Sequence, residues 1–183
     1  QRCGVMYELF PECVLDLEAW LGACGELGYR RVIMLGHSLG CCKSVHYFQK
    51  RRPRNVVGMV LMSPPDMIGL VTLPRYQPYC TRLRKEAVQN VAAGQPKKLL
   101  SSQLWNWYAL SSQTFLSIFS EGGEADVFPL YRNPQLFPQL AAVDVPILAL
   151  MGELDDIVIR SLDEDLDLIE ARAAACPSFT RGI

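Results

Sequence analysis

The stretch Arg31–Gly40, RVIMLGHSLG, decides how this chain folds. Its first five residues form a short apolar run typical of a buried strand, and residues 40–51 have a helical pattern. Between them, GHSLG at residues 36–40 fits the pattern Gly-x-Ser-x-Gly, in which a strand turns sharply into a helix with the serine at the apex. We expect side chains at positions 36 and 40 to collide in so tight a turn, which would explain both glycines.

The turn places the hydroxyl of Ser38 above the edge of the sheet, where it can act as a nucleophile. It also directs the backbone N–H of Leu39, at the start of the helix, toward an oxyanion that develops during attack on an acyl carbon. The alternative is an incidental serine at a strand–helix junction. The flanking strand and helix favour the nucleophile.

Further apolar runs predict buried strands at residues 56–62 and 146–151, and residues 178–183 look like the beginning of another strand. Helical spacing of apolar residues predicts further helices at about 11–27, before the first strand, and at 163–175, between the last two strands. Strands that alternate with helices predict an α/β fold with a parallel sheet.

The segment from Leu73 to Phe137 is too long for one crossover, and we interpret it as a mainly helical cap insertion with helices at about 81–93 and 97–108. The predicted organisation is core (1–72), cap (73–137) and core (138–183). The cap is rich in aromatic residues that suit either an apolar substrate region or its own core. These are Trp105, Trp107, Tyr108, Phe115, Phe119 and Phe128.

Three acidic residues compete for the role of orienting a catalytic histidine. Asp155 lies three residues beyond the glycine that ends the strand at 146–151, and is the preferred candidate because such acids follow a strand carboxyl end. Asp156 is its neighbour. Asp66 follows the strand at 56–62 and opens at the same edge of the sheet. A solvated loop acid or a helix cap is the structural alternative for the other two.

Neither histidine of the chain suits the role of general base. His37 adjoins Ser38 in the turn, where neighbouring side chains diverge, and His46 lies about 12 Å further along the helix axis. A base must approach to about 3 Å. We therefore expect both to be structural, and the catalytic histidine to follow the strand that begins at 178–183, beyond the end of this sequence.

Composition excludes several classes of partner. The formal net charge of −1, with scattered Lys and Arg, argues against nucleic acid. No apolar run reaches the roughly 18 residues that span a membrane. The seven cysteines form no CxxC pair, so we expect no metal site, and reduced thiols in a cytoplasmic protein.

Four tracts resemble the α/β-hydrolase superfamily, and more narrowly the DUF1749-type hydrolases: GHSLG, VLMSPPDMIGL, EADVFPLYRNP and PILALMGELDDIV. The resemblance implies a truncated α/β-hydrolase fold in which Ser38 attacks a small-molecule acyl substrate, Asp155 orients the missing histidine and the Leu39 N–H stabilises the oxyanion. It implies no metal or organic cofactor. A second oxyanion donor would come from a loop upstream of Gln1.

The function expected from this set is serine-hydrolase cleavage of an ester or related acyl bond, with negligible turnover by residues 1–183 alone. Acyl transfer to another acceptor uses the same residues and stays open. A non-enzymatic binding or scaffold protein on the same fold is the second alternative.

Overall fold

Four parallel strands form the sheet of this computed structural model, which describes residues 5–132 and 134–183. The strands lie in the order β1-β2-β3-β4, each parallel to its neighbour. Every run predicted as a strand is present, and the α/β fold with a parallel sheet is confirmed. The strands are β1 (Val32–His37), β2 (Val56–Met62), β3 (Ile147–Leu150) and β4 (Phe179–Gly182).

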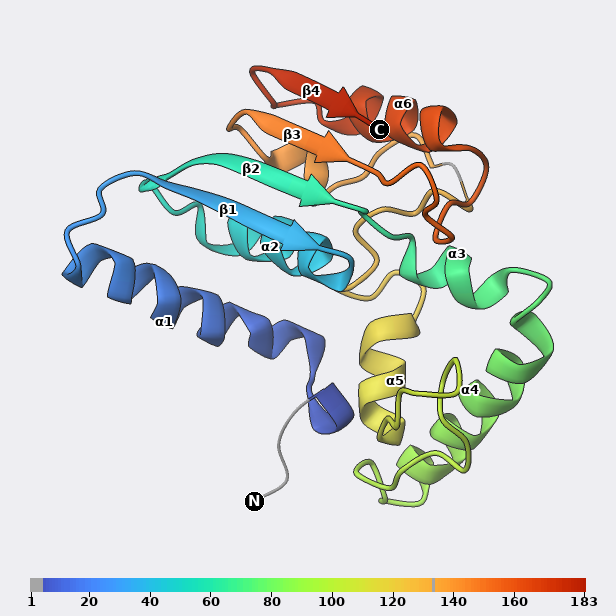
Figure 1. The fold of residues 1–183 in the computed structure, drawn as a ribbon. Coiled ribbons are helices and arrows are strands. Elements are labelled where there is room, and N and C mark those ends of the chain that lie inside the picture. The colour runs from blue at the N-terminus through green and yellow to red at the C-terminus, as the bar shows by residue number, and fades with distance from the viewer. Residues whose placement is uncertain (1–4, 133) are drawn as a thin grey trace.

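Helices cover one face of the sheet (Figure 1). α1 (Cys13–Glu26) and α2 (Leu39–Arg51) lie along β1 and β2, and α6 (Leu162–Arg172) lies beside β4, where Arg181 pairs with Asp167 of the helix. This face carries the apolar residues that the helices bury. They are Met34, Met59, Leu61, Ile147 and Ala149.

The opposite face of the sheet is apolar and open to solvent. Ile33 and Leu35 of β1 are 63% and 62% exposed, and Met62 of β2 is 37% exposed. Side chains alternate between the two faces of a strand, so these residues share the face opposite the buried Met34. No element within the described ranges buries them.

Three helices lie beyond the carboxyl ends of the strands, on the side to which the arrowheads of Figure 1 point. They are α3 (Met67–Thr72), α4 (Gln77–Ala92) and α5 (Ser112–Phe119). The helix predicted at 81–93 is the larger part of α4, which starts earlier because Pro78 occupies its first turn. The boundaries of the cap at 73 and 137 stay a prediction.

The helix predicted over residues 97–108 is wrong. This segment is a loop with two isolated antiparallel bridges. Trp105 and Asn106 have φ angles of 51° and 64°, and two left-handed residues in succession end any right-handed helix. The helix of this region is α5 instead, whose N-cap Ser111 accepts a hydrogen bond from the Thr114 N–H.

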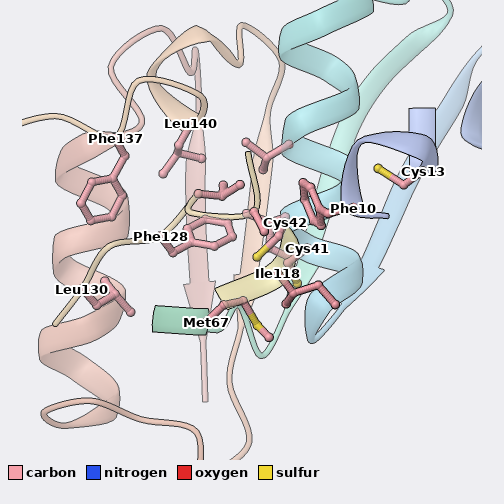
Figure 2. Packing of buried hydrophobic residues seen from close by; sticks show 14 of the residues in the cluster. Phe10, Cys13, Cys41, Cys42, Met67, Ile118, Phe128, Leu130, Phe137 and Leu140 are labelled. Carbon is pink, nitrogen blue, oxygen red and sulfur yellow. The ribbon is translucent and has the colours of Figure 1, made fainter. Parts of the chain in front are cut away.

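Side chains from the helices, the sheet and the connecting loops meet in one core (Figure 2). Two short 3-10 turns contribute to it, η2 (Phe10–Glu12) through Phe10 and η3 (Leu140–Ala142) through Leu140, whereas η1 (Val5–Tyr7) buries no residue. Figure 2 shows Phe10 beside the two cysteines of α2, and Phe137 beside α6. The core thus joins η2, near the start of the described residues, to the segment before β3. This packing holds the sheet in place, and with it the turns at the ends of the strands.

The exposed face of β1 predicts self-association of this chain. We expect the double substitution Ile33→Thr and Leu35→Thr to raise the soluble monomer fraction severalfold, because threonine keeps strand propensity while removing apolar area. Size-exclusion chromatography with light scattering at equal loading measures that fraction. The matched change Met34→Thr, at a buried position, should instead lower stability. An unchanged aggregate fraction in the double variant would show that another surface associates.

Candidate active site

Ser38 occupies a sharp turn between β1 and α2. Its backbone angles, φ 53° and ψ −126°, lie outside both the strand and the helix regions. A non-glycine residue with positive φ is strained, and such strain persists only where the surrounding structure imposes it. The predicted sequence of strand, tight turn and helix is therefore present at residues 32–51.

The two glycines of the turn have different roles. A Cβ on Gly36 would lie 2.5 Å from the carbonyl oxygen of Gly40, a distance that no side chain can adopt. A Cβ on Gly40 would meet nothing within 4 Å. The expectation that side chains at both positions collide is correct for Gly36 and wrong for Gly40, because α2 carries its own residue 40 away from the strand.

Hydrogen bonds from the turn to β2 hold Ser38 in place. The Ser38 N–H donates to the Met62 carbonyl at 2.9 Å. Beneath the turn, the Cys41 thiol donates to the carbonyls of Gly36 and Met62 at 3.2 and 3.1 Å. Burial raises the pKa of the Cys41 thiol to about 12, so it remains protonated and keeps donating. Sequence reasoning missed this cysteine, since a buried thiol in a helix reads as a small apolar residue.

Asp155 follows β3 and reaches the end of β2. Its carboxylate accepts a hydrogen bond from the hydroxyl of Ser63, the first residue after β2, and its own N–H donates to Gly152 at 2.9 Å. Ser63 has a φ of 52° and donates its N–H to Leu150 at 2.7 Å. The sequence did not single out Ser63, although a serine between a strand and two prolines was visible.

Asp66 is engaged by the backbone. It is 1% exposed and caps α3, with one carboxylate oxygen accepting from the Gly69 N–H at 2.7 Å and the other from the Tyr131 N–H at 2.6 Å. Burial raises the pKa of this carboxyl to about 6. These bonds tie α3 to the segment at 131, which is the structural role that sequence analysis gave as the alternative.

The neighbour Asp156 is exposed and lies at the pocket described below. Its backbone carbonyl accepts a hydrogen bond of 2.8 Å from Arg75, which joins the loop after β3 to the residues before α4.

The two histidines lie in different surroundings, and neither is hydrogen-bonded to the Ser38 hydroxyl. His46 is 1% exposed, contacts the Phe10 ring edge-on at 5.2 Å between centroids, and its Nδ1 lies 2.9 Å from Gln139 Oε1. Burial lowers its pKa. His37 is exposed and lines the pocket beside Ser38. Among residues 5–132 and 134–183 no side chain is hydrogen-bonded to the Ser38 hydroxyl.

Two pockets meet at Ser38. The outer one has a volume of about 470 Å³ and the inner one about 90 Å³. Of the six cap aromatics, Trp105 and Tyr108 line both pockets, Trp107 lines the outer and Phe119 the inner. The other two, Phe115 and Phe128, are core residues with exposures of 0% and 1%.

The described part of the chain contains no group of three or more His, Cys, Asp or Glu side chains placed to bind a metal ion. None of its helices combines the length and the apolar character needed to cross a membrane.

Sequence comparison finds one family. The family model described as "Protein of unknown function (DUF1749)" matches residues 11–178. No curated protein is significantly similar in sequence.

Solved structures share the fold at low identity. An esterase from Pyrococcus furiosus aligns with a TM-score of 0.54 and 15% identity over 96% of this chain and 53% of that protein. An N-acyl homoserine lactone degrading enzyme aligns with a TM-score of 0.54 and 14% identity, over 99% of this chain and 69% of that protein. The monoacylglycerol lipase of Paleococcus ferrophilus aligns with a TM-score of 0.51 and 16% identity, over 96% of this chain and 65% of that protein. The chain thus spans about half to two thirds of these proteins.

The asymmetry of the two glycines is testable by unfolding in urea. We expect Gly36→Ala to lower the free energy of unfolding by about 2–3 kcal/mol, because the added Cβ must displace backbone. Gly40→Ala is the matched control, and we expect a change under about 1 kcal/mol, in the stabilising direction, since alanine favours a helix. Equal losses in the two variants would contradict this geometry.

The carboxyl of Asp66 predicts a pH dependence of stability. Its pKa in the folded protein, about 6, exceeds the unfolded value of 3.8, so the folded state binds more proton between these values. Its contribution to the free energy of unfolding should therefore fall by about 2 kcal/mol as pH rises from about 4 to 6, and become constant above about 7.

Urea unfolding of wild type and Asp66→Asn across this pH range measures the effect as a difference. The asparagine loses one hydrogen bond at every pH, so only the slope matters. His46 has the opposite sign, because its lowered pKa removes stability as pH falls, and it cancels between the two proteins. Parallel profiles would exclude a raised pKa at Asp66.

Proposed function

The chain belongs to the DUF1749 family and has a partial α/β-hydrolase fold, and from this premise we propose that its protein is a serine hydrolase that cleaves a carboxylic ester or related acyl bond. The observation that carries the proposal is the strained turn at Ser38, which opens on two pockets. Strain of this kind at a pocket favours a catalytic serine over an incidental one.

In the proposed reaction the Ser38 oxygen attacks the acyl carbon, and its proton passes to a general base. Leu39 is the first residue of α2, so its N–H has no acceptor within the helix and can donate to the developing oxyanion. The alcohol leaves with the proton from the base, which gives an acyl-enzyme. Water then attacks this ester, and its proton takes the same route.

The base is not among the described residues in this proposal. His46 is packed in the core, and His37 projects from the position next to Ser38. We assign the role to a histidine outside residues 5–183, oriented by Asp155. The Ser63 hydroxyl would fix the Asp155 carboxylate at the edge of the sheet where Ser38 also lies, since both follow carboxyl ends of parallel strands.

The substrate in this proposal is a small acyl compound, and the site uses no metal or organic cofactor. The six described cysteines are free thiols, which supports a cytoplasmic protein. The net charge of −1 supports the expectation that nucleic acid is not a partner.

Two alternatives use the same residues. Acyl transfer replaces water by another acceptor at the acyl-enzyme stage. A non-enzymatic binding protein is favoured by one observation, that neither described histidine serves Ser38. An ester assay with and without added alcohol separates the first from hydrolysis, and the absence of any turnover favours the second.

Substitution in the entire encoded protein tests the assigned roles. We expect Ser38→Ala to lower kcat for p-nitrophenyl esters by at least about 10³-fold, and Asp155→Asn by about 10³- to 10⁴-fold, because each removes a member of a unit that acts together. Asp156→Asn is the matched control, with a change of only a few fold. Steady-state kinetics and circular dichroism measure activity and folding.

Two results would contradict these roles. Activity retained by Ser38→Ala excludes the nucleophile and with it the serine mechanism. A loss at Asp156 that equals or exceeds the loss at Asp155 reassigns the acid to the pocket-lining neighbour.

A further inference from the structure

Trp105 is held in an unusual backbone conformation next to Ser38. Its φ is 51° and that of Asn106 is 64°, and the Trp107 N–H donates back to the Leu104 carbonyl at 3.3 Å. Two left-handed residues closed by such a bond form a type I′ turn, which favours Asn, Asp or Gly at both central positions. Asparagine at 106 fits that preference, and tryptophan at 105 does not. The strain thus lies at the residue whose ring reaches the pockets.

The indole is fixed by ring contacts. It meets the rings of Tyr76, Tyr108 and Phe119 edge-on, with centroids 6.0–6.1 Å apart. Its Nε1 is buried and has no hydrogen-bond partner among the described residues. A ring held between three others, without a polar anchor, acts as a rigid apolar wall.

This wall stands where the two pockets meet. Five residues line both of them, and beyond these the pockets differ in character. The outer pocket adds the charged Arg75 and Asp156, whereas the inner pocket adds only apolar side chains, from the 3-10 turn at Val5, from the loop and from α5. The shared residues are Ser38, Leu39, Met67, Trp105 and Tyr108.

The inner pocket is small. Its volume is about 90 Å³, against about 470 Å³ for the outer pocket. An acyl chain that extends from the Ser38 oxygen into this pocket therefore has less room than a group in the outer pocket. The outer pocket, about 470 Å³ with polar groups at its rim, suits the alcohol part.

We propose that Trp105 determines substrate specificity as the wall between the two pockets, and so favours short acyl groups on Ser38 over long ones. This inference rests on the proposed function. The strained turn holds the indole between the pockets, and removing the ring would join them into one larger space.

An acyl-length series of p-nitrophenyl esters, from acetate to octanoate, tests the proposal in the entire encoded protein. Wild type should prefer the short esters, from acetate through butyrate, and kcat/KM for octanoate should be at least tenfold lower than for these. Trp105→Gly should raise the octanoate to butyrate ratio at least tenfold, because each methylene that gains a pocket contributes about fourfold. Glycine suits the turn, but the variant loses the contacts of the indole with three rings, so the thermal midpoint should fall by several degrees while circular dichroism shows the fold retained.

The matched control is Trp107→Gly. Trp107 lies two residues away, is 67% exposed and lines only the outer pocket, so the acyl-length profile should not change. Trp105→Phe keeps an aromatic ring and serves if the glycine variant fails to fold. It should move the longest accepted chain by one or two carbons.

The outcomes separate the two proposals. If Ser38→Ala is inactive but neither Trp105 variant changes the profile, or if Trp107→Gly changes it equally, Trp105 does not set chain length and the serine mechanism stands. If Ser38→Ala keeps activity, or wild type hydrolyses no ester of the series, the proposed function fails and this inference with it.

Discussion

The structure depends on a ladder of backbone hydrogen bonds that continues past the ends of the strands. Ser38 donates to Met62 beyond β1, Ser63 donates to Leu150 beyond β2, and Met151 donates to Gly182 beyond β3. Each loop therefore starts at a position set by the neighbouring strand. Ser38, Ser63 and the loop that carries Asp155 lie along one edge of the sheet because all of its strands are parallel.

Strain is concentrated where this edge meets the cap. Among residues 5–132 and 134–183, five non-glycine residues have positive φ. Four of them are Ser38 and Trp105, which line both pockets, Ser63 directly after β2, and Asn106 next to Trp105. The fifth, Arg52, ends α2 on the other side of the molecule as a left-handed helix cap. Such conformations need support from packing, which here comes from the buried core beneath the sheet and the aromatic contacts of the cap.

Local patterns predicted the sheet and the turn well, and the cap poorly. The strand at 56–62 was predicted at its observed bounds, because a buried strand needs a continuous apolar run that glycine and proline delimit. The segment 97–108 was predicted as a helix, but Trp105 and Asn106 have left-handed φ, and Leu104 and Tyr108 exchange backbone hydrogen bonds across that turn. The bond between Ser63 and Asp155 joins residues 92 positions apart, and the bond from the Tyr131 N–H to Asp66 joins residues 65 positions apart, which no local pattern contains.

The thiol of Cys41, beneath the turn at Ser38, determines how this cysteine reacts with chemical probes in the folded protein. Cys41 has no exposed surface, and burial keeps it in the unreactive thiol form, so an alkylating reagent gains access only when the bend above it opens. The partly exposed Cys24 and Cys176 need no such opening. The rate of Cys41 alkylation would thus measure how often the turn that carries Ser38 opens.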